Sequence, residues 1–391
     1  GPTSAASIPI TVTFDESVSG FTVDDIQVAN GAVNNFADAG GGVYTASIDT
    51  SGSSTGTITV DIAAGVATDG AGNGNTAATQ FSIEFDSSLV SVDVTTSAAD
   101  PTNASSIEFV ITFGESVTGF EAADIEVTNG TKGALNVVSS ETVYSLDVTP
   151  TSDGPVTVTV LANTTTAVSG GAGNEAGSLS IAYDGTAPAV EITSTESGPT
   201  SEASIPITIT FDESVTGFDV TDLTVANGLA GNFVDAGGGV YISDISTASS
   251  SDGQITVDIA AGVATDAAGN SNTAATQFAI TYDGTAPGVE ITSTETGPTS
   301  EASISITVTF DEAVTGFTVE DIQVANGVVG NFVDMSGGVY TADISTASSS
   351  DGQITVDIAA DAAFDAAGNG NTAATQFAIT YDGTSPGVEI T

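Results

Sequence analysis

The sequence repeats itself four times, and this repetition constrains the fold more than any other feature. The string Thr-Phe-Asp-Glu recurs with its phenylalanine at Phe14, Phe211 and Phe310, and a variant, Thr-Phe-Gly-Glu, stands at Phe113. In chain order these phenylalanines are 99, 98 and 99 residues apart. Self-similarity at a fixed period indicates a repeat architecture. A unit of about a hundred residues is large enough to bury its own core, so we expect four tandem domains.

Short linkers mark the expected domain boundaries. Asp-Gly-Thr-Ala-Pro occurs at 184–188 and at 283–287, and Asp-Gly-Thr-Ser-Pro occurs at 382–386. The join after Asp86 has a different sequence. We therefore expect domains at 1–86, 87–184, 185–283 and 284–382, followed by 383–391 as a linker and the first strand of a following or neighbouring domain. The first domain is expected to lack its own first strand, because residue 1 corresponds to Gly198 of the third.

The hydrophobic pattern within each repeat predicts strands. Ile205, Ile207, Ile209 and Phe211 alternate with polar residues or proline, and this period of two with β-branched residues is typical of half-buried strands. The strands expected in the third repeat are 205–211, 223–225, 232–235, 240–245, 255–259 and 278–282, with 289–291 opening the next domain. We expect an all-β fold of four immunoglobulin-like antiparallel β-sandwiches in an elongated rod. Pro206 and Pro9 predict an edge or a bulge in the second strand.

Charge excludes several classes of function. The chain has 50 acidic residues, a single base (Lys132) and no histidine, giving a formal net charge of -49. Nucleic acid and anionic membrane surfaces would repel it, so neither is an expected partner. There is also no cysteine, so catalysis by histidine or cysteine lacks its groups. No apolar run is long enough to insert directly into a membrane. We do not expect an enzyme.

The sandwich topology gathers carboxylates at one pole of each domain. The loop after the second strand and the loop before the last strand lie at the same end as the incoming linker. In the third repeat they carry Asp212, Glu213, Asp266 and Asn270, and the linker supplies Asp184. Carboxylates at this density cannot all stay ionised without compensation. Ca²⁺ takes six to eight oxygen ligands, so the pattern predicts calcium at the joints.

The same positions supply the predicted ligands of the other repeats. At the joint that contains Asp283, the preceding domain is expected to add Glu196, Glu202 and Asp252. The second repeat departs from the pattern, with Gly114 in place of aspartate, and its joint is expected to bind fewer ions or bind them weakly. The full predicted metal set is Asp15, Glu16, Asp69, Asn73, Asp86, Glu115, Asn174, Asp184, Asp212, Glu213, Asp266, Asn270, Asp283, Asp311, Glu312, Asp365 and Asn369.

Simpler interpretations compete with some of these motifs. The acidic excess as a whole is also what a solvated acidic surface would show. Asp222 and its equivalents Asp25, Asp124 and Asp321 follow short loops and are expected to be turn or helix-cap residues rather than ligands. The glycine triplets at 40–42 and 237–239 are expected to be hairpin turns, since no lysine accompanies them as in a phosphate-binding loop.

The motifs together resemble a known family. Phe-Asp-Glu-Ser-Val-Thr-Gly-Phe at 211–218, Asp-Ala-Ala-Gly-Asn at 266–270 and Asp-Gly-Thr-Ala-Pro at 283–287 are similar to bacterial Ig-like repeats. Such repeats build the stalks of giant biofilm-associated and RTX-type surface adhesins. The resemblance implies an extracellular location at the cell surface, rigidification by Ca²⁺ at the linkers, and an adhesion ligand that binds outside this segment.

Two functions remain open on this basis. The first is a structural extender, or stalk, of a cell-surface adhesin, with neighbouring repeats as its partners. The second is a self-assembling subunit of an extracellular filament or surface layer, with other copies of the chain as its partners. In the second case the strand expected at 387–391 would be donated to the next subunit, because adding a strand to an open sandwich satisfies unpaired backbone groups.

Overall fold

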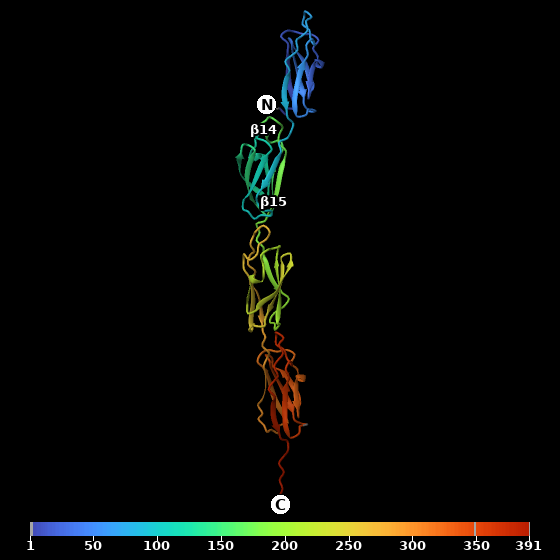
Figure 1. The fold of residues 1–391 in the computed structure, drawn as a ribbon. Helices are drawn as coiled ribbons and strands as arrows, with labels where there is room; N and C mark the ends of the chain where they lie inside the picture. The colour runs from blue at the N-terminus through green and yellow to red at the C-terminus, as the bar shows by residue number, and fades with distance from the viewer. Residues whose placement is uncertain (1–2, 348, 391) are drawn as a thin grey trace. The chain divides into compact units, whose positions relative to one another are not determined.

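Each repeat folds as a β-sandwich of two antiparallel sheets (Figure 1). The computed structural model describes residues 3–347 and 349–390. The third repeat has the clearest correspondence to the sequence pattern. Its strands are β16 (Val190–Ser194), β17 (Ser204–Phe211), β18 (Leu223–Ala226), β19 (Leu229–Gly237), β20 (Val240–Ser246), β21 (Gly253–Ile259) and β22 (Phe278–Tyr282).

The two sheets of the third repeat enclose one core. One sheet has the order β16-β17-β20-β19 and the other the order β18-β21-β22. Ile207 and Ile209 from the first sheet and Val257 from the second are buried in the same cluster. Alternation along each strand places these β-branched side chains inside and the threonines between them outside. The predicted immunoglobulin-like all-β fold is therefore confirmed.

The fourth repeat has the same architecture. Its strands are β23 (Val289–Ser293), β24 (Ser303–Phe310), β25 (Ile322–Ala325), β26 (Val328–Asp334), β27 (Val339–Ser345), β28 (Gly352–Ile358) and β29 (Phe377–Tyr381). The sheet orders are β23-β24-β27-β26 and β25-β28-β29. Beyond β29, the described residues 382–390 form no strand.

The second repeat adds a short pair of strands to this plan. Its strands are β7 (Val92–Thr96), β8 (Ile107–Phe113), β9 (Val117–Thr118), β10 (Ile125–Thr128), β11 (Gly130–Ser139), β12 (Val143–Pro150), β13 (Gly154–Val160), β14 (Thr166–Ala167) and β15 (Gly177–Tyr183). The sheets are β11-β12-β8-β7 and β10-β13-β15, and β14 pairs with β9.

The first repeat has a narrower first sheet than the others. Its strands are β1 (Ser7–Thr13), β2 (Ile26–Ala29), β3 (Ala32–Gly40), β4 (Val43–Asp49), β5 (Gly56–Ile62) and β6 (Phe81–Phe85). The sheets are β1-β4-β3 and β2-β5-β6. Within the described residues, no strand occupies the place that β7, β16 and β23 take beside the second strand of their domains.

Proline placement corrects one expectation. Pro206 lies in β17, which pairs with β16 on one side and β20 on the other, so β17 is an interior strand and the expected edge is wrong there. The proline is tolerated because β16 pairs only with the stretch from Ile207 to Phe211, and Pro206 lies just beyond it. In the first repeat, Pro9 does lie on an edge strand, β1.

The chain divides into two compact units. Unit 1 comprises Gly1–Thr186 and Ala268–Asn270, and unit 2 comprises Ala187–Ala267 and Ser271–Thr391. The fourth repeat and the linker that enters it therefore lie together in unit 2. None of the helices in the described part of the chain has the length and apolar character needed to cross a membrane.

Candidate metal centre

Aromatic packing fixes the loop that carries Asp311 and Glu312. Phe310 ends β24 and Phe317 returns the loop to the core, and their rings meet edge-on with centroids 5.1 Å apart. Phe317 also packs against Tyr340 of β27 at 4.9 Å. Edge-to-face pairs at this distance are favourable, so both ends of the loop are held by the core.

A glycine allows the neighbouring hairpin to approach this loop. Gly338 has φ +81° and its backbone carbonyl accepts a hydrogen bond from the Phe310 N–H at 2.8 Å. A Cβ at this position would lie 2.2 Å from the carbonyl oxygen of Glu312. Only glycine fits, because both the backbone conformation and the space exclude a side chain. The equivalent glycines of the first and third repeats end the triplets 40–42 and 237–239, which form hairpin turns as expected.

The linker into the fourth repeat is hydrogen-bonded at both of its ends. At its start, the Asp252 carboxylate accepts hydrogen bonds from the Gly284 N–H (2.7 Å) and the Thr285 hydroxyl. At its end, the Gly288 N–H donates to the Asp311 carboxylate at 2.8 Å. Asp252 was expected at this joint, and it does hold the linker. These contacts orient Asp283 toward the fourth repeat.

The loop before the last strand presents Asp365. One oxygen of its carboxylate accepts from the N–H groups of Ala367 and Asn369, both at 2.8 Å. The Asn369 amide donates to the other oxygen at 2.9 Å and to the backbone carbonyl of Asp283 at 2.8 Å. Asp365 is only 5% exposed. Asn369 therefore connects the loop to the linker through its amide nitrogen.

Three carboxylates from these elements converge. Asp283, Glu312 and Asp365 each offer an oxygen, and these oxygens lie within 4.8 Å of one another. Ca²⁺–oxygen distances are about 2.3–2.6 Å, so two ligands on opposite sides of one ion are about 4.6–5.2 Å apart. The spacing fits a single calcium ion. Asp311, which was in the predicted set, instead has its carboxylate engaged by the linker.

The electrostatics of the cluster disfavour three bare anions. Burial raises the pKa of Glu312 above its ordinary value of 4.5, and the carboxylates of Asp365, Asp283, Asp311 and Asp252 raise it further. The only base of the chain, Lys132, donates instead to the backbone carbonyls of Ala122 and Ile125 in the second repeat. A bound cation would reverse this penalty, because an opposite charge favours the ionised form.

The first repeat carries a loop equivalent to the one that holds Asp365, and within the described residues no linker contacts it. Asp69 accepts from the N–H groups of Ala71 and Asn73 and from the Asn73 amide, all at 2.8 Å. The hydrogen bonds from Asn73 lower the pKa of Asp69. Asp15, Glu16, Asp69 and Asn73 line one hollow of about 430 Å³. The loop geometry is thus set by the domain itself and does not need the linker.

The second repeat corrects one predicted ligand. Asn174 is fully buried, its amide oxygen accepts from the Thr164 and Thr165 N–H groups, and its amide nitrogen donates to the Leu161 and Glu175 carbonyls. This is the pattern of Asn272 and Asn371, not that of Asn270 and Asn369. Asn174 therefore holds the loop together and does not face a metal site. The sequence contains a sign of this difference, because fewer residues separate Asn174 from the last strand of its domain than separate Asn270 from the last strand of the third repeat.

Asp86 and Glu115, the other ligands predicted for the second repeat, make local contacts. The Asp86 carboxylate accepts from the Ser88 N–H at 2.9 Å. Glu115 accepts from the Ser169 hydroxyl at 2.7 Å. The buried asparagines Asn272 and Asn371 were not singled out from the sequence, although the string Gly-Asn-x-Asn-Thr recurs in three repeats.

In the third repeat the predicted ligands fall in both compact units. Asp184 and Asn270 belong to unit 1, where the Asn270 amide donates to the Asp184 carbonyl at 2.8 Å. Asp212, Glu213 and Asp266 belong to unit 2. The Asp212 carboxylate accepts from the Ala189 N–H at 2.9 Å, and Asp266 is buried. The arrangement of Asp212 is that of Asp311 in the next repeat.

The residues expected to be caps are caps. Asp222 ends the short 3₁₀ helix η3 (Val220–Asp222), and its carboxylate accepts from the N–H of Asp219 at 2.8 Å. Asp25, Asp124 and Asp321 accept from the backbone N–H of the residue three positions before them in the same way.

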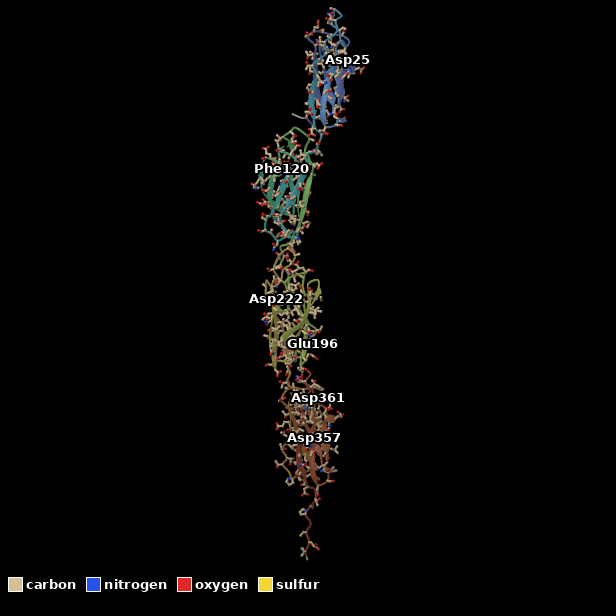
Figure 2. The ribbon with its side chains drawn as sticks, in the orientation of Figure 1. Asp25, Phe120, Glu196, Asp222, Asp357 and Asp361 are labelled. Carbon is tan, nitrogen blue, oxygen red and sulfur yellow. The ribbon has the colours of Figure 1, made fainter. Side chains whose placement is uncertain are left out.

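In Figure 2, Asp222 and Glu196 are both labelled in the third repeat. Glu196 and Glu202 are not among the carboxylates that raise the pKa of Glu312.

Comparison with known proteins gives the following matches. The model of a bacterial Ig-like domain matches residues 2–85, 86–183, 184–282 and 283–381. A search of curated protein sequences gave no match. The solved structure of FdeC, an Escherichia coli adhesin, is 14% identical, covers 76% of this chain and 98% of its own, and has a TM-score of 0.38.

Two further solved structures are similar. Invasin, described as a bacterial integrin-binding protein, is 12% identical, with 97% of this chain and 77% of its own covered and a TM-score of 0.36. InvD of Yersinia pseudotuberculosis is 13% identical, with 76% and 98% covered and a TM-score of 0.33. At these identities the likeness concerns the fold alone.

Proposed function

Starting from the fact that this chain belongs to the bacterial Ig-like domain family, we propose that it is a stalk segment of a bacterial cell-surface adhesin, stiffened by Ca²⁺ at its linkers. Its location is then extracellular and its role is structural rather than enzymatic. Tandem sandwiches joined by short linkers act as spacers, and the stiffness of a spacer depends on how far each linker can bend.

The observation that supports calcium is the convergence of Asp283 with Glu312 and Asp365. Asp283 belongs to the linker, whereas Glu312 and Asp365 belong to two loops of the domain that follows. An ion bound to all three would tie the linker to both loops. Hinge motion would then require breaking ligand bonds in addition to the hydrogen bonds of Asp252 and Asp311.

The chemistry of the cluster favours Ca²⁺ over other divalent ions. All candidate ligands are oxygen atoms, and the chain has no histidine or cysteine for zinc or copper. Mg²⁺ requires near-ideal octahedral geometry at about 2.0–2.1 Å and usually keeps several water ligands, whereas Ca²⁺ accepts six to eight oxygens in a flexible arrangement. By sequence alone, we extend the proposal to the equivalent loop residues of the first and third repeats.

The test is calcium binding by the full chain and by single variants. Extracellular calcium modules have Kd values of about 10⁻⁴–10⁻³ M, so 10 mM Ca²⁺ should stabilise the fourth domain by about 1.4–2.7 kcal/mol. Calorimetric titration should give fewer bound ions for Asp365→Asn than for the parent chain. Glu290→Gln removes an exposed carboxylate of the same domain and should leave the number unchanged.

Each outcome of this titration bears on the proposal. If the chain binds no Ca²⁺ at 10 mM, or if Asp365→Asn and Glu290→Gln bind as many ions as the parent, the calcium-stiffened stalk is wrong. Substitution of Mg²⁺ for Ca²⁺ should give weaker stabilisation at the same concentration.

A further inference from the structure

One loop of the third repeat reaches the fourth repeat directly. This loop, residues 195–203, joins β16 to β17, and we call it the docking loop. Its Ser201 hydroxyl donates a hydrogen bond to the backbone carbonyl of Ala367 at 2.9 Å. Ala367 lies in the loop that presents Asp365, and Ser201 and Ala367 both belong to unit 2. The contact is additional to the linker, so the two repeats are joined at two places.

The docking loop is anchored on both sides of Ser201. Before it, the Thr200 carbonyl accepts a hydrogen bond from the Asp283 N–H at 3.0 Å. After it, the Glu202 N–H donates to the Thr200 hydroxyl oxygen at 3.2 Å, and the Glu202 carbonyl accepts from the Thr247 hydroxyl at 2.8 Å. Ser201 is therefore held in place before it meets its partner, and forming its hydrogen bond costs little conformational entropy.

The docking loop contacts both elements that bring carboxylates to the joint. Thr200 holds the backbone of Asp283, which belongs to the linker. Ser201 holds the loop of Asp365. The Ala367 peptide connects this second contact to the cluster, because its N–H donates to the Asp365 carboxylate while its carbonyl accepts from Ser201. Two adjacent residues of the third repeat thus help to set the distance between two of the three converging carboxylates.

The same contact occurs between the first and second repeats, both within unit 1. The Ser4 hydroxyl donates to the backbone carbonyl of Gly171 at 3.1 Å. Ser169 and Asp365 each follow the residue whose N–H donates to the loop after the second strand, so they are equivalent. Gly171 lies two residues after Ser169, as Ala367 lies two residues after Asp365. The contact is therefore made even where the carboxylate of the loop is missing.

The second repeat uses an asparagine where the first and third use a serine. The Asn103 amide donates to the amide oxygen of Asn270 at 3.1 Å, and both residues belong to unit 1. The docking loops carry Pro-Thr-Ser at 2–4 and 199–201 and Pro-Thr-Asn at 101–103. Each of these loops therefore places a hydrogen-bond donor at the same position, and each donor meets the loop before the last strand of the following repeat.

We propose that the docking loop of each repeat binds the loop before the last strand of the following repeat and restrains the joint without any ion. The partner is the next repeat of the same chain, and a hydroxyl or amide donor recognises an oxygen of its loop. The restraint goes beyond the proposed calcium function, because it is present in chelator. One neutral hydrogen bond shifts the equilibrium between a docked and an undocked joint by about two- to tenfold, so docking limits bending and does not abolish it.

The experiment measures bending at the joint that contains Asp283, in the full chain and in chelator. The chain has no cysteine, so spin labels at Thr224→Cys and Gln323→Cys mark only two equivalent exposed positions, in β18 and β25. The distribution of distances between the labels, from double electron–electron resonance, reports how far the joint bends. Ser201→Ala should raise the ratio of undocked to docked conformers by about two- to tenfold.

Two further variants show whether the hydrogen bond is the cause. Ser201→Asn keeps a donor, as Asn103 does in the second repeat, and should give the distance distribution of the parent. Ser300→Ala removes the equivalent hydroxyl of the fourth repeat and should leave this joint unchanged. If Ser201→Ala gives the distribution of the parent, or if Ser201→Asn broadens it as much as the alanine does, the docking proposal is wrong.

The joint between the first and second repeats tests docking away from the carboxylate cluster. Labels at Gln27→Cys and Glu126→Cys occupy the equivalent exposed positions of β2 and β10. Ser4→Ala should broaden the distribution of distances between them in chelator, because the carbonyl of Gly171 loses its donor. An unchanged distribution would contradict docking as a general feature of the repeats.

Docking also makes a prediction for the calcium site, and this part rests on the proposed function. If docking holds Asp283 and Asp365 together before the ion binds, Ser201→Ala should raise the Kd for Ca²⁺ by about two- to tenfold and leave the number of bound ions unchanged. An unchanged Kd would contradict this positioning role. Asp365→Asn should instead lower the number of ions.

The two proposals fail separately. A chain that binds no Ca²⁺ contradicts the calcium function, and greater bending of its Ser201→Ala variant in chelator still supports docking. A Ser201→Ala variant that bends as the parent does contradicts docking, whereas loss of an ion in Asp365→Asn still supports calcium at the joint.

Discussion

At the scale of single residues, two of the carboxylates expected at the joint that contains Asp283 hold the linker and do not join the cluster. Asp252 and Asp311 hold the linker by accepting hydrogen bonds from its backbone. At this joint, the oxygens of Asp283, Glu312 and Asp365 converge. All five are acidic residues of one joint, but Asp252 comes from the third repeat, Asp283 from the linker and the other three from loops of the fourth repeat, so the difference between them lies in where the backbone places each one. It leads to a prediction for Glu312.

In the absence of calcium, Glu312 should destabilise the fourth domain at neutral pH. Its pKa is raised in the folded state by burial and by neighbouring carboxylates, so the folded state holds the proton more tightly than the unfolded state. This contribution to stability is present below the ordinary value of 4.5 and is lost as pH rises through the folded-state pKa. We therefore compare the melting temperatures of the parent and of Glu312→Gln in chelator. The melting temperature of the parent minus that of the variant should become more positive as the pH falls from 7 to about 4.5.

Calcium should invert the effect of the same substitution. With Ca²⁺ at pH 7, Glu312→Gln should melt below the parent because a ligand is lost. Thermal melts of the two chains at several pH values, with and without Ca²⁺, check both signs. Glu290→Gln serves as the control, and a pH-independent difference between parent and Glu312→Gln in chelator would contradict the expectation.

The buried asparagines make a prediction about stability alone. Asn371 is 1% exposed; its amide oxygen accepts from the Ala363 N–H and its nitrogen donates to two carbonyls. Asn371→Ala leaves these buried groups unpaired, at about 1–3 kcal/mol for each group that water cannot reach. We expect a loss of about 2–4 kcal/mol for the fourth domain by chemical denaturation. Asn369→Ala, in the same loop but half-buried, should cost clearly less.

At the scale of elements, the aromatic cluster and the β26–β27 hairpin together position the acidic loop. Phe310, Phe317 and Tyr340 pack in the same edge-on arrangement as their equivalents in the other repeats. The loop is thus built by the core, and the hairpin closes over it through Gly338. Adjacent glycines of that hairpin provide a matched test.

Gly338→Ala should destabilise the fourth domain more than Gly337→Ala does. Both glycines have positive φ, 81° and 68°, so either alanine is strained by about 1–2 kcal/mol. Only at Gly338 would the new Cβ meet a backbone atom, the Glu312 carbonyl oxygen, at 2.2 Å. Denaturation curves give the free energy of unfolding of both variants. Gly337→Ala reports backbone strain alone, and Gly338→Ala reports the same strain together with the clash. Equal losses would mean that the close approach is unimportant.

At the scale of the whole molecule, four related domains differ in how completely they are built. Within the described residues, the first sheet of the first domain has three strands where those of the others have four, and the second domain lacks the acidic pattern of the third and fourth. These differences between repeats bear on which domain is least stable.

The first domain should unfold at the lowest temperature in dilute solution. Its incompletely covered core buries less apolar surface than that of the third or fourth domain, and burial is the main stabilising term. Calorimetry should show a separate early transition. Ile48→Ala should shift that transition only, whereas Ile344→Ala, at the equivalent position, should shift a later one.

Calcium should also change the scattering of the whole chain. If linkers lose hinge freedom when ions bind, small-angle X-ray profiles should differ between Ca²⁺ and chelator, with a wider range of conformations in chelator. The Asp283→Ala chain should scatter in Ca²⁺ more as the parent does in chelator. Identical profiles in both solutions would contradict calcium stiffening.

The repeat period, the strand pattern and the capping residues could be predicted because they are local. β-Branched alternation such as Ile205 to Phe211 specifies a half-buried strand wherever it occurs, and Asp222 caps a helix three residues long. Asn174 was misassigned because the same three letters, Ala-Gly-Asn, occupy different positions relative to the last strand. The motif by itself does not show which of its asparagines is buried, whereas the hydrogen bonds of the folded loop do.

The sequence alone determined that this chain folds as four all-β sandwiches, because hydrophobic period and motif spacing are properties of neighbouring residues. Only the tertiary structure decided which carboxylates meet and which hold the linker, because hydrogen bonds between distant loops set those distances.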